Sequence, residues 1–141
     1  VSLKNGVDVI QMDLESGLAG FEDNSFDTVI LSRTIQSMHN IQSIISEMQR
    51  VGQEIIVTFP NFGYWRNRLQ IIKGGMPVSK ELPYSWFNTP NIHLCTISDF
   101  DNFCAMHKVA VIEKHIMTDQ KAVNFYPNLF GALALYKLVK K

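Results

Sequence analysis

Polar side chains follow each of three apolar segments of the sequence, at places where a ligand could be bound. These side chains are Asp13, the triplet Ser32, Arg33 and Thr34, and Asn61. In open α/β sheets, ligands bind beyond the carboxyl ends of the strands. The carboxylate of Asp13 could accept hydrogen bonds from an adenine amino group or a sugar hydroxyl, or it could equally cap the following loop. The hydroxyls of Ser32 and Thr34 could line a pocket, but they have no neighbouring base that would activate them.

A second group of polar residues follows the third apolar segment. Asn61 can donate and accept hydrogen bonds at once, and Arg66 and Arg68 follow it closely. An arginine guanidinium is well suited to hold a carboxylate or a phosphate. Two arginines on one short helix can equally form a solvated face, and the sequence leaves both interpretations open.

Other catalytic and metal-binding patterns are weak or absent. His93 and Cys95 would share one face of a strand, so a thiol nucleophile with a histidine base is geometrically allowed, although a buried structural thiol is the alternative. The four histidines lack the spacing of metal ligands, and we expect no metal site. The sequence contains neither a P-loop nor a G-x-S-x-G motif.

The composition favours a soluble globular protein. The 141 residues include 46% hydrophobic residues, and 13 Lys plus Arg balance 13 Asp plus Glu. Without a basic excess, the chain lacks the electrostatic pattern of a protein that binds nucleic acid or an anionic membrane. No apolar run is long enough for a membrane span. With two cysteines and no signal peptide, we expect a cytoplasmic protein with one domain over residues 1–141.

Hydrophobic patterns predict the elements that would position these residues. We expect strands over residues 7–12, 26–32, 54–59, 109–117 and 132–139, and helices over 41–51, over 65–72 and after Thr96 or Ser98. The first βαβ unit predicts a parallel pair, and the last two strands, with no helix between them, predict an antiparallel hairpin. The expected fold is a Rossmann-like, doubly wound α/β fold with a mostly parallel sheet. An aromatic-rich insertion or lid would occupy residues 61–95.

One segment resembles a large enzyme family. Residues 25–51 (SFDTVILSRTIQSMHNIQSIISEMQRV) are similar to the fourth strand and following helix of class I S-adenosylmethionine-dependent methyltransferases. The resemblance implies that Asp13, with Leu14 beside it, contacts the adenine of the cofactor. It also implies that Ser32, Arg33 and Thr34 flank the methionine moiety.

A narrower resemblance covers the chain from about Gly6 to Leu138. Residues 58–70 (TFPNFGYWRNRLQ), 74–100 and 127–138 (PNLFGALALYKL) are similar to the MetW family of methionine biosynthesis proteins. This family implies a role beside homoserine O-acyltransferase, which would be the partner.

The sequence departs from the methyltransferase pattern, and the largest departure is at its amino-terminal end. It starts at Val1 and contains no glycine-rich turn of the D-x-G-C-G-D-G type. We therefore expect the amino-terminal part of the fold to be missing, and we expect S-adenosylmethionine or S-adenosylhomocysteine to bind only the native-length protein. An incomplete sheet also exposes a strand edge, which predicts self-association.

Two functions follow as hypotheses. The first is a partner protein that supports homoserine acylation through the aromatic segment containing Tyr84, Trp86 and Phe87, although these rings could equally pack over the sheet as a lid or core. The second is a methyltransferase acting on a small molecule, with Asp13 on the adenine. The residues expected to face a substrate or partner are Asn61, Trp65, Arg66, Tyr84, Trp86, Asn91 and His93.

Overall fold

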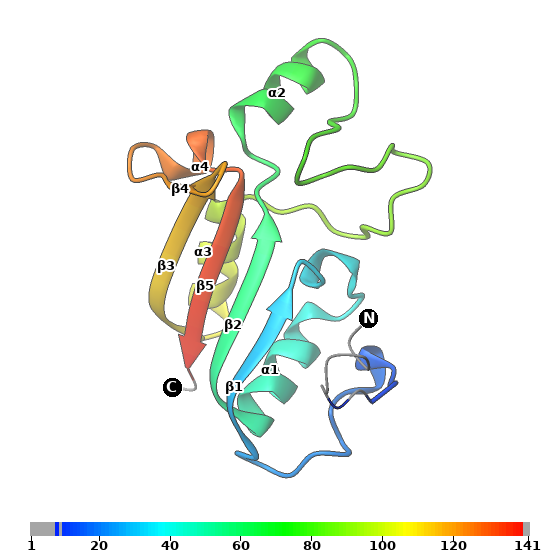
Figure 1. Ribbon diagram of the computed structural model, residues 1–141, viewed down its shortest axis with the longest axis vertical. Helices are drawn as coiled ribbons and strands as arrows, with labels where there is room; N and C mark the ends of the chain where they lie inside the picture. Colours follow the sequence, from blue (N-terminus) through cyan, green and yellow to red (C-terminus); the bar gives the residue numbers. More distant parts are fainter. Residues whose placement is uncertain (1–7, 9, 140–141) are drawn as a thin grey trace.

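A five-stranded mixed sheet organises the computed structural model, which describes residue 8 and residues 10–139 (Figure 1). The strands are β1 (Phe26–Ser32), β2 (Gly52–Pro60), β3 (Ala110–Thr118), β4 (Lys121–Ala122) and β5 (Leu133–Val139). They lie in the order β1-β2-β5-β3-β4. The helices are α1 (Ile41–Val51), α2 (Trp65–Ile72), α3 (Ile97–Met106) and α4 (Pro127–Phe130), with 3₁₀ turns η2 (Leu14–Ser16) and η3 (Ile35–Ser37).

The strand directions confirm the predicted α/β class but correct the predicted mostly parallel sheet: the described sheet is mixed, with one parallel and three antiparallel strand pairs. β1 and β2 are parallel, and α1 forms the crossover between them. β5 runs antiparallel to both of its neighbours, β2 and β3. It follows that β1, β2 and β3 all point the same way. β5 lies between β2 and β3 and runs in the opposite direction. The α/β fold and the antiparallel pairing of the last two long strands are as predicted, with β4 and α4 added in the connection.

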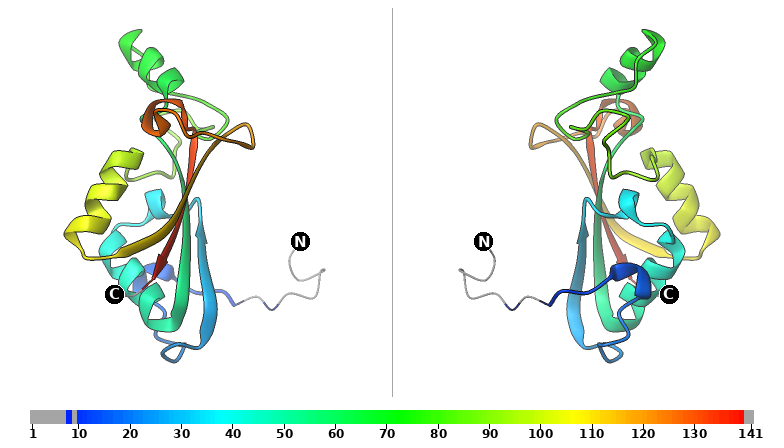
Figure 2. Two further views of the ribbon diagram at one scale, coloured as in Figure 1. Left: turned by 90° about the vertical axis from the view of Figure 1, so that its left-hand side faces the viewer. Right: turned by 90° about the vertical axis from the view of Figure 1, so that its right-hand side faces the viewer.

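The hydrophobic core lies between the sheet and two helices. Figure 2 shows α1 and α3 on the same side of the sheet. The rings of Phe59, Phe100 and Tyr136 meet there, with centroids 4.7 to 5.7 Å apart. From α1, the side chains of Ile44, Ile45, Met48 and Val51 are buried against the sheet. This is the face expected from their helical spacing.

Local signals set the helix starts. The side chain of Asn40 accepts a hydrogen bond from the Ser43 N–H (3.0 Å) and so caps the start of α1, the helix predicted over residues 41–51. Of the two candidate caps for α3, Thr96 is the one used, and it forms a reciprocal capping box with Asp99. Gly52 follows α1 with a φ of −118°, so it is not a left-handed cap. A Cβ there would lie 2.5 Å from Val29 Cγ2, so the packing of β1 on β2 requires the glycine.

The strand predicted over residues 7–12 is wrong where it can be checked. Asp8 and residues 10–12 form no strand, while residues 7 and 9 lie outside the described residues. A strand needs a neighbour for its backbone groups, and no described strand pairs with this segment. The outer edge of β1 also has no partner strand among the described residues, so self-association stays a prediction. None of the described helices has the length and apolarity to cross a membrane.

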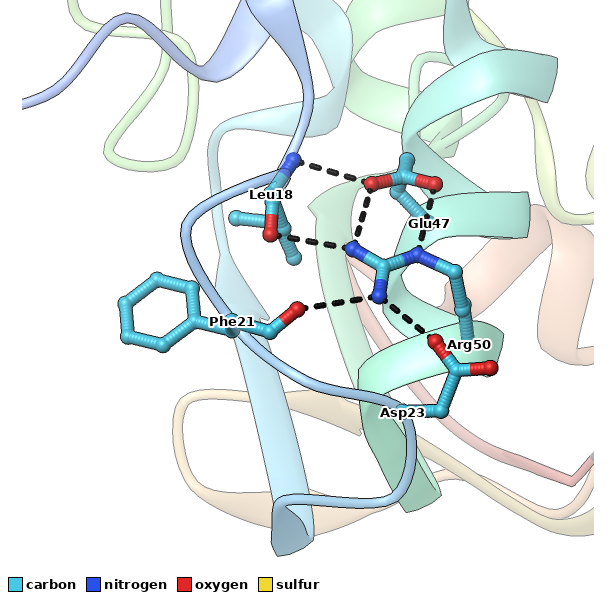
Figure 3. A network of polar contacts seen from close by, with 5 residues as sticks. All are labelled: Leu18, Phe21, Asp23, Glu47 and Arg50. Atoms are coloured by element: carbon cyan, nitrogen blue, oxygen red, sulfur yellow. Dashed lines mark hydrogen bonds and ion pairs between the residues drawn. The ribbon is translucent and has the colours of Figure 1, made fainter.

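An ion-pair network fixes the loop before β1 to α1 (Figure 3). Arg50 donates from Nη1 to the carbonyl of Phe21 (2.9 Å) and to Asp23 (2.8 Å), and from Nη2 to the carbonyl of Leu18 (3.0 Å). Glu47 accepts from Arg50 Nε (3.0 Å) and from the Leu18 N–H (3.1 Å). These donors favour the carboxylate and lower the pKa of Glu47 below its ordinary value of 4.5.

We expect Glu47→Gln to make the stability of the fold less dependent on pH in the acidic range. Because the pKa of Glu47 is lower in the folded state, its contribution to stability is complete above about pH 4.5 and is lost as pH falls through the folded value. The variant should melt roughly 3–6 °C lower at pH 7, and the difference from the unmodified protein should shrink towards pH 3. Thermal melts at several pH values test this. Glu22→Gln, at an exposed acid, is the control, and parallel pH profiles for Glu47→Gln and the unmodified protein would contradict the prediction.

Candidate functional site

Three segments meet beyond the carboxyl end of β1. On one side, the N–H of His39 donates to Glu15 Oε1 (2.6 Å), which joins the loop after β1 to η2. On the other side, the carbonyl of Gln36 accepts from the N–H groups of Ile92 (2.8 Å) and His93 (2.9 Å). The loop after β1 is therefore held between the segment that contains Asp13 and the segment 91–95.

The residues predicted to bind a cofactor lie in the first two of these segments. Asp13 is exposed and accepts from the Glu15 N–H (3.0 Å), so its carboxylate does cap the following turn. Leu14 is half-buried and packs against the core. Thr34 Oγ1 donates to the carbonyl of Ser32 (2.9 Å), which turns the chain after β1.

Arg33 has an unusual backbone and a long-range partner. Its φ of +52° lies in the left-handed region, and its N–H donates to the carbonyl of Thr58 (2.9 Å). Its guanidinium pairs with Glu81 at 2.5 Å. The guanidinium that was predicted to face a cofactor therefore already forms an ion pair with an acid in the segment between α2 and α3.

Asn61 is a buried structural residue at the end of β2, with 1% of its surface exposed. Its Nδ2 donates to the carbonyls of Asn128 (3.0 Å) and Gly131 (2.7 Å). Its Oδ1 accepts from the N–H groups of Gly63 (3.0 Å) and Ile97 (3.3 Å). With both polar atoms engaged twice, the side chain connects β2, α3 and α4 and has no group directed at a substrate.

The aromatic surface, defined as Tyr84, Trp86, Phe87 and Asn91, lies in the segment between α2 and α3. Within it, 74% of Trp86 and 71% of Phe87 are exposed, and the two rings meet edge to face at 5.8 Å. Trp86 and Phe87 are therefore not part of the core, and a lid role for their segment stays a prediction. Tyr84, Trp86 and Asn91 also line a small groove of about 50 Å³. In Figure 1 this segment extends beyond the carboxyl end of β2.

The other predicted contact residues lie apart from these rings. Trp65 and Arg66 begin α2, and the Arg66 guanidinium lies 5.3 Å from the centre of the Trp65 ring. His93 is exposed, with Nε2 3.4 Å from the carbonyl of His39. Arg68 donates to the carbonyl of Gly63 (2.6 Å) and so fixes the turn before α2.

The cysteines have the properties of structural thiols. Burial, together with the charge of Asp99, raises the pKa of Cys95 to about 12, and burial raises the pKa of Cys104 to about 11. Both thiols are neutral at physiological pH, and only a thiolate is a good nucleophile. His93 and Cys95 also lie in a loop rather than on a strand. Within the described part of the chain, no three His, Cys, Asp or Glu side chains gather in a way that could hold a metal ion.

Sequence reasoning missed two residues near this end of the sheet. Glu81 pairs with Arg33 from 48 positions away (81 − 33). Asn67 is buried on α2 with 2% of its surface exposed, where a helical asparagine is ordinarily solvated. Neither residue belongs to a local pattern, because each acquires its environment from a distant part of the chain.

Comparisons with known proteins agree on a family and a fold. The model of the family "Methionine biosynthesis protein MetW" matches residues 1–138. A bifunctional methionine biosynthesis protein MetXA/MetW from Rhodopirellula baltica is 38% identical over 111 residues, covering 77% of this chain and 18% of that protein. The chain thus spans less than a fifth of the length of this relative.

Among solved structures, a S-adenosylmethionine-dependent methyltransferase from Thermotoga maritima superposes with a TM-score of 0.66 at 16% identity. The match covers 99% of this chain and 67% of that one. A S-adenosylmethionine-dependent methyltransferase from Aquifex aeolicus gives a TM-score of 0.57 at 12% identity, covering 97% of this chain and 58% of that one. At these identities the likeness shows the class I methyltransferase fold.

Proposed function

This chain belongs to the MetW family of methionine biosynthesis proteins, and from that premise we propose that it binds a homoserine O-acyltransferase and supports its reaction. The observation that carries the proposal is the aromatic surface. Tryptophan, tyrosine and phenylalanine are enriched where proteins meet, and here two such rings contact each other edge to face while most of their surface is exposed to solvent. A binding role accounts for apolar area that folding leaves exposed.

The relative from Rhodopirellula baltica supports a physical link. Its name describes a MetXA part and a MetW part in a single polypeptide. In this proposal, the MetXA part corresponds to the acyltransferase that the family resemblance implies. Joining two proteins in one chain raises their effective concentration, an arrangement that suits parts that work in contact.

A cofactor role fits the described residues only in part. Asp13 could meet an adenine or a ribose hydroxyl, since one of its carboxylate oxygens remains free of the cap, and the hydroxyls of Ser32 and Thr34 lie at the end of β1. The guanidinium of Arg33 is paired with Glu81, and the sequence contains no glycine-rich turn that could hold the remainder of the cofactor. We therefore infer no methyl-transfer step from these residues.

The proposal predicts a faster acylation reaction. The rate of homoserine acylation by the acyltransferase should rise several-fold when this protein is added, and the rise should saturate at the concentration at which the complex forms. A steady-state assay of acyl transfer, run beside sedimentation of the mixture, measures both. A complex without a rate change would contradict the supporting role, and the absence of any complex would contradict the partnership.

A further inference from the structure

A second, polar pocket lies between α2 and the turn that joins β3 to β4, apart from the groove of the aromatic surface. It has a volume of about 170 Å³. Its walls come from α2, from residues 78–81, from the β3–β4 turn and from the start of β5. Its lining includes four charged side chains and one buried amide: Arg66, Lys80, Glu81, Asp119 and Asn67.

Asn67 lines this pocket and carries an acceptor that is unpartnered among the described residues. Asn67 is 2% exposed, and its Nδ2 donates to the carbonyls of Asn61 (3.2 Å) and Phe62 (3.4 Å). These bonds fix the orientation of the amide. Its Oδ1 is buried and has no hydrogen-bond partner among the described residues. Buried polar atoms are almost always satisfied, so the missing partner is expected to be a donor that enters the pocket.

The charges around the pocket have both signs. Arg66 forms no ion pair with any described residue, so its guanidinium is available for an anion. Lys80 and Asp119 pair only loosely at 3.7 Å, with 74% and 72% of their side chains exposed. Glu81 contributes a mostly buried carboxylate that is shared with Arg33. A simple anion would meet two acids here, and a simple cation would meet two bases, whereas a molecule that carries both charges matches both walls.

We propose that this pocket binds a free α-amino acid. The carboxylate of the ligand pairs with Arg66 and Lys80, and its ammonium group donates to Asn67 Oδ1 and faces Glu81. A charged donor on a buried amide oxygen is a strong hydrogen bond, and a guanidinium is the natural partner of a carboxylate. The site is a property of this chain alone and does not depend on binding to an acyltransferase.

The test uses the free chain and a defined set of probes. Thermal shift is measured with the twenty standard amino acids and with L-homoserine, because a ligand that binds only the folded state raises the melting temperature. Calorimetry then gives the dissociation constant of the tightest binder, expected at roughly 10 µM to 1 mM. The methyl ester of that amino acid lacks the negative charge, and its deaminated analogue lacks the ammonium group. Each should bind at least about tenfold more weakly.

A matched pair of variants separates the site from general charge effects. Arg66→Gln should weaken binding of the amino acid at least about tenfold, while Lys73→Gln, which removes an exposed cation at the end of the same helix, should not. Both substitutions are at exposed positions, so each variant should fold. The proposal is overturned if no amino acid binds at about 10 mM, or if the tightest binder and both analogues bind equally well. Either result leaves the acylation assay, and the function it tests, unaffected.

Discussion

Replacing Trp86 and Phe87 together by alanine should weaken the complex with homoserine O-acyltransferase by at least about 100-fold, while the chain remains folded. Exposed aromatic side chains that become buried in an interface are typical hot spots, and each contributes about 2 kcal/mol or more. Two such losses together exceed the factor of 100, which corresponds to about 2.8 kcal/mol.

The same exposure predicts that the double variant is stable. With 74% of Trp86 and 71% of Phe87 open to solvent, neither ring fills space in the core, so truncation leaves no cavity. Calorimetric titration of the acyltransferase gives the affinity, and a thermal melt gives the stability. A weakened complex with an unchanged melting temperature is the expected pair of results.

A second aromatic pair provides a matched control. Phe125 and Tyr126 are 71% and 66% exposed, and their rings meet edge to face at 4.6 Å. Their double alanine variant removes a similar exposed area from a different part of the chain. If this variant loses as much affinity as the Trp86 and Phe87 variant, non-specific adhesion of exposed rings explains the result. If the Trp86 and Phe87 variant binds normally, the aromatic surface is not the contact.

The sequence predicted those elements whose signals are local. Asn40 and Thr96 mark helix starts because a side chain caps backbone groups only two or three positions away. The amphipathic spacing of α1 likewise identifies the face that is buried. The segment 7–12 carries an equally good local pattern for a strand, but a strand also requires a neighbour that the local pattern does not reveal.

The candidate site depended on contacts between distant residues and was therefore harder to predict. The strand ends identified where polar residues would gather, and the loop after β1 does meet the segments around residues 13–16 and 91–93. What each of these polar side chains does at the site depends on partners that lie far away in the sequence. Arg33 was expected to face a ligand and instead pairs with Glu81. Asn61 has polar partners 67 and 70 residues further along the chain, and no spacing rule connects them.

Asn61→Ala should destabilise the fold by about 3–5 kcal/mol, the largest stability effect that we expect from a single substitution here. The change removes both donors that hold the carbonyls of Asn128 and Gly131, and it removes an acceptor for the N–H of Gly63. Because this region is buried, water replaces the lost partners poorly, and each unsatisfied group is penalised. Proteins of this size unfold with a free energy of only about 5–15 kcal/mol, so urea denaturation should show a large fall in the midpoint.

Two further substitutions show whether hydrogen bonds or volume account for the loss. Asn61→Asp keeps the size and the acceptor oxygen Oδ1 but replaces the donating NH2 group by a second carboxylate oxygen that faces the carbonyls of Asn128 and Gly131. If the donors matter, this variant should be at least as unstable as Asn61→Ala near pH 7, because it buries an unpaired charge against two acceptors. Asn124→Ala, at an exposed position in the connection before α4, should leave the midpoint unchanged. A stable Asn61→Asp variant would mean that Asn61 merely fills space, and the ends of β2, α3 and α4 would then be held together by apolar packing alone.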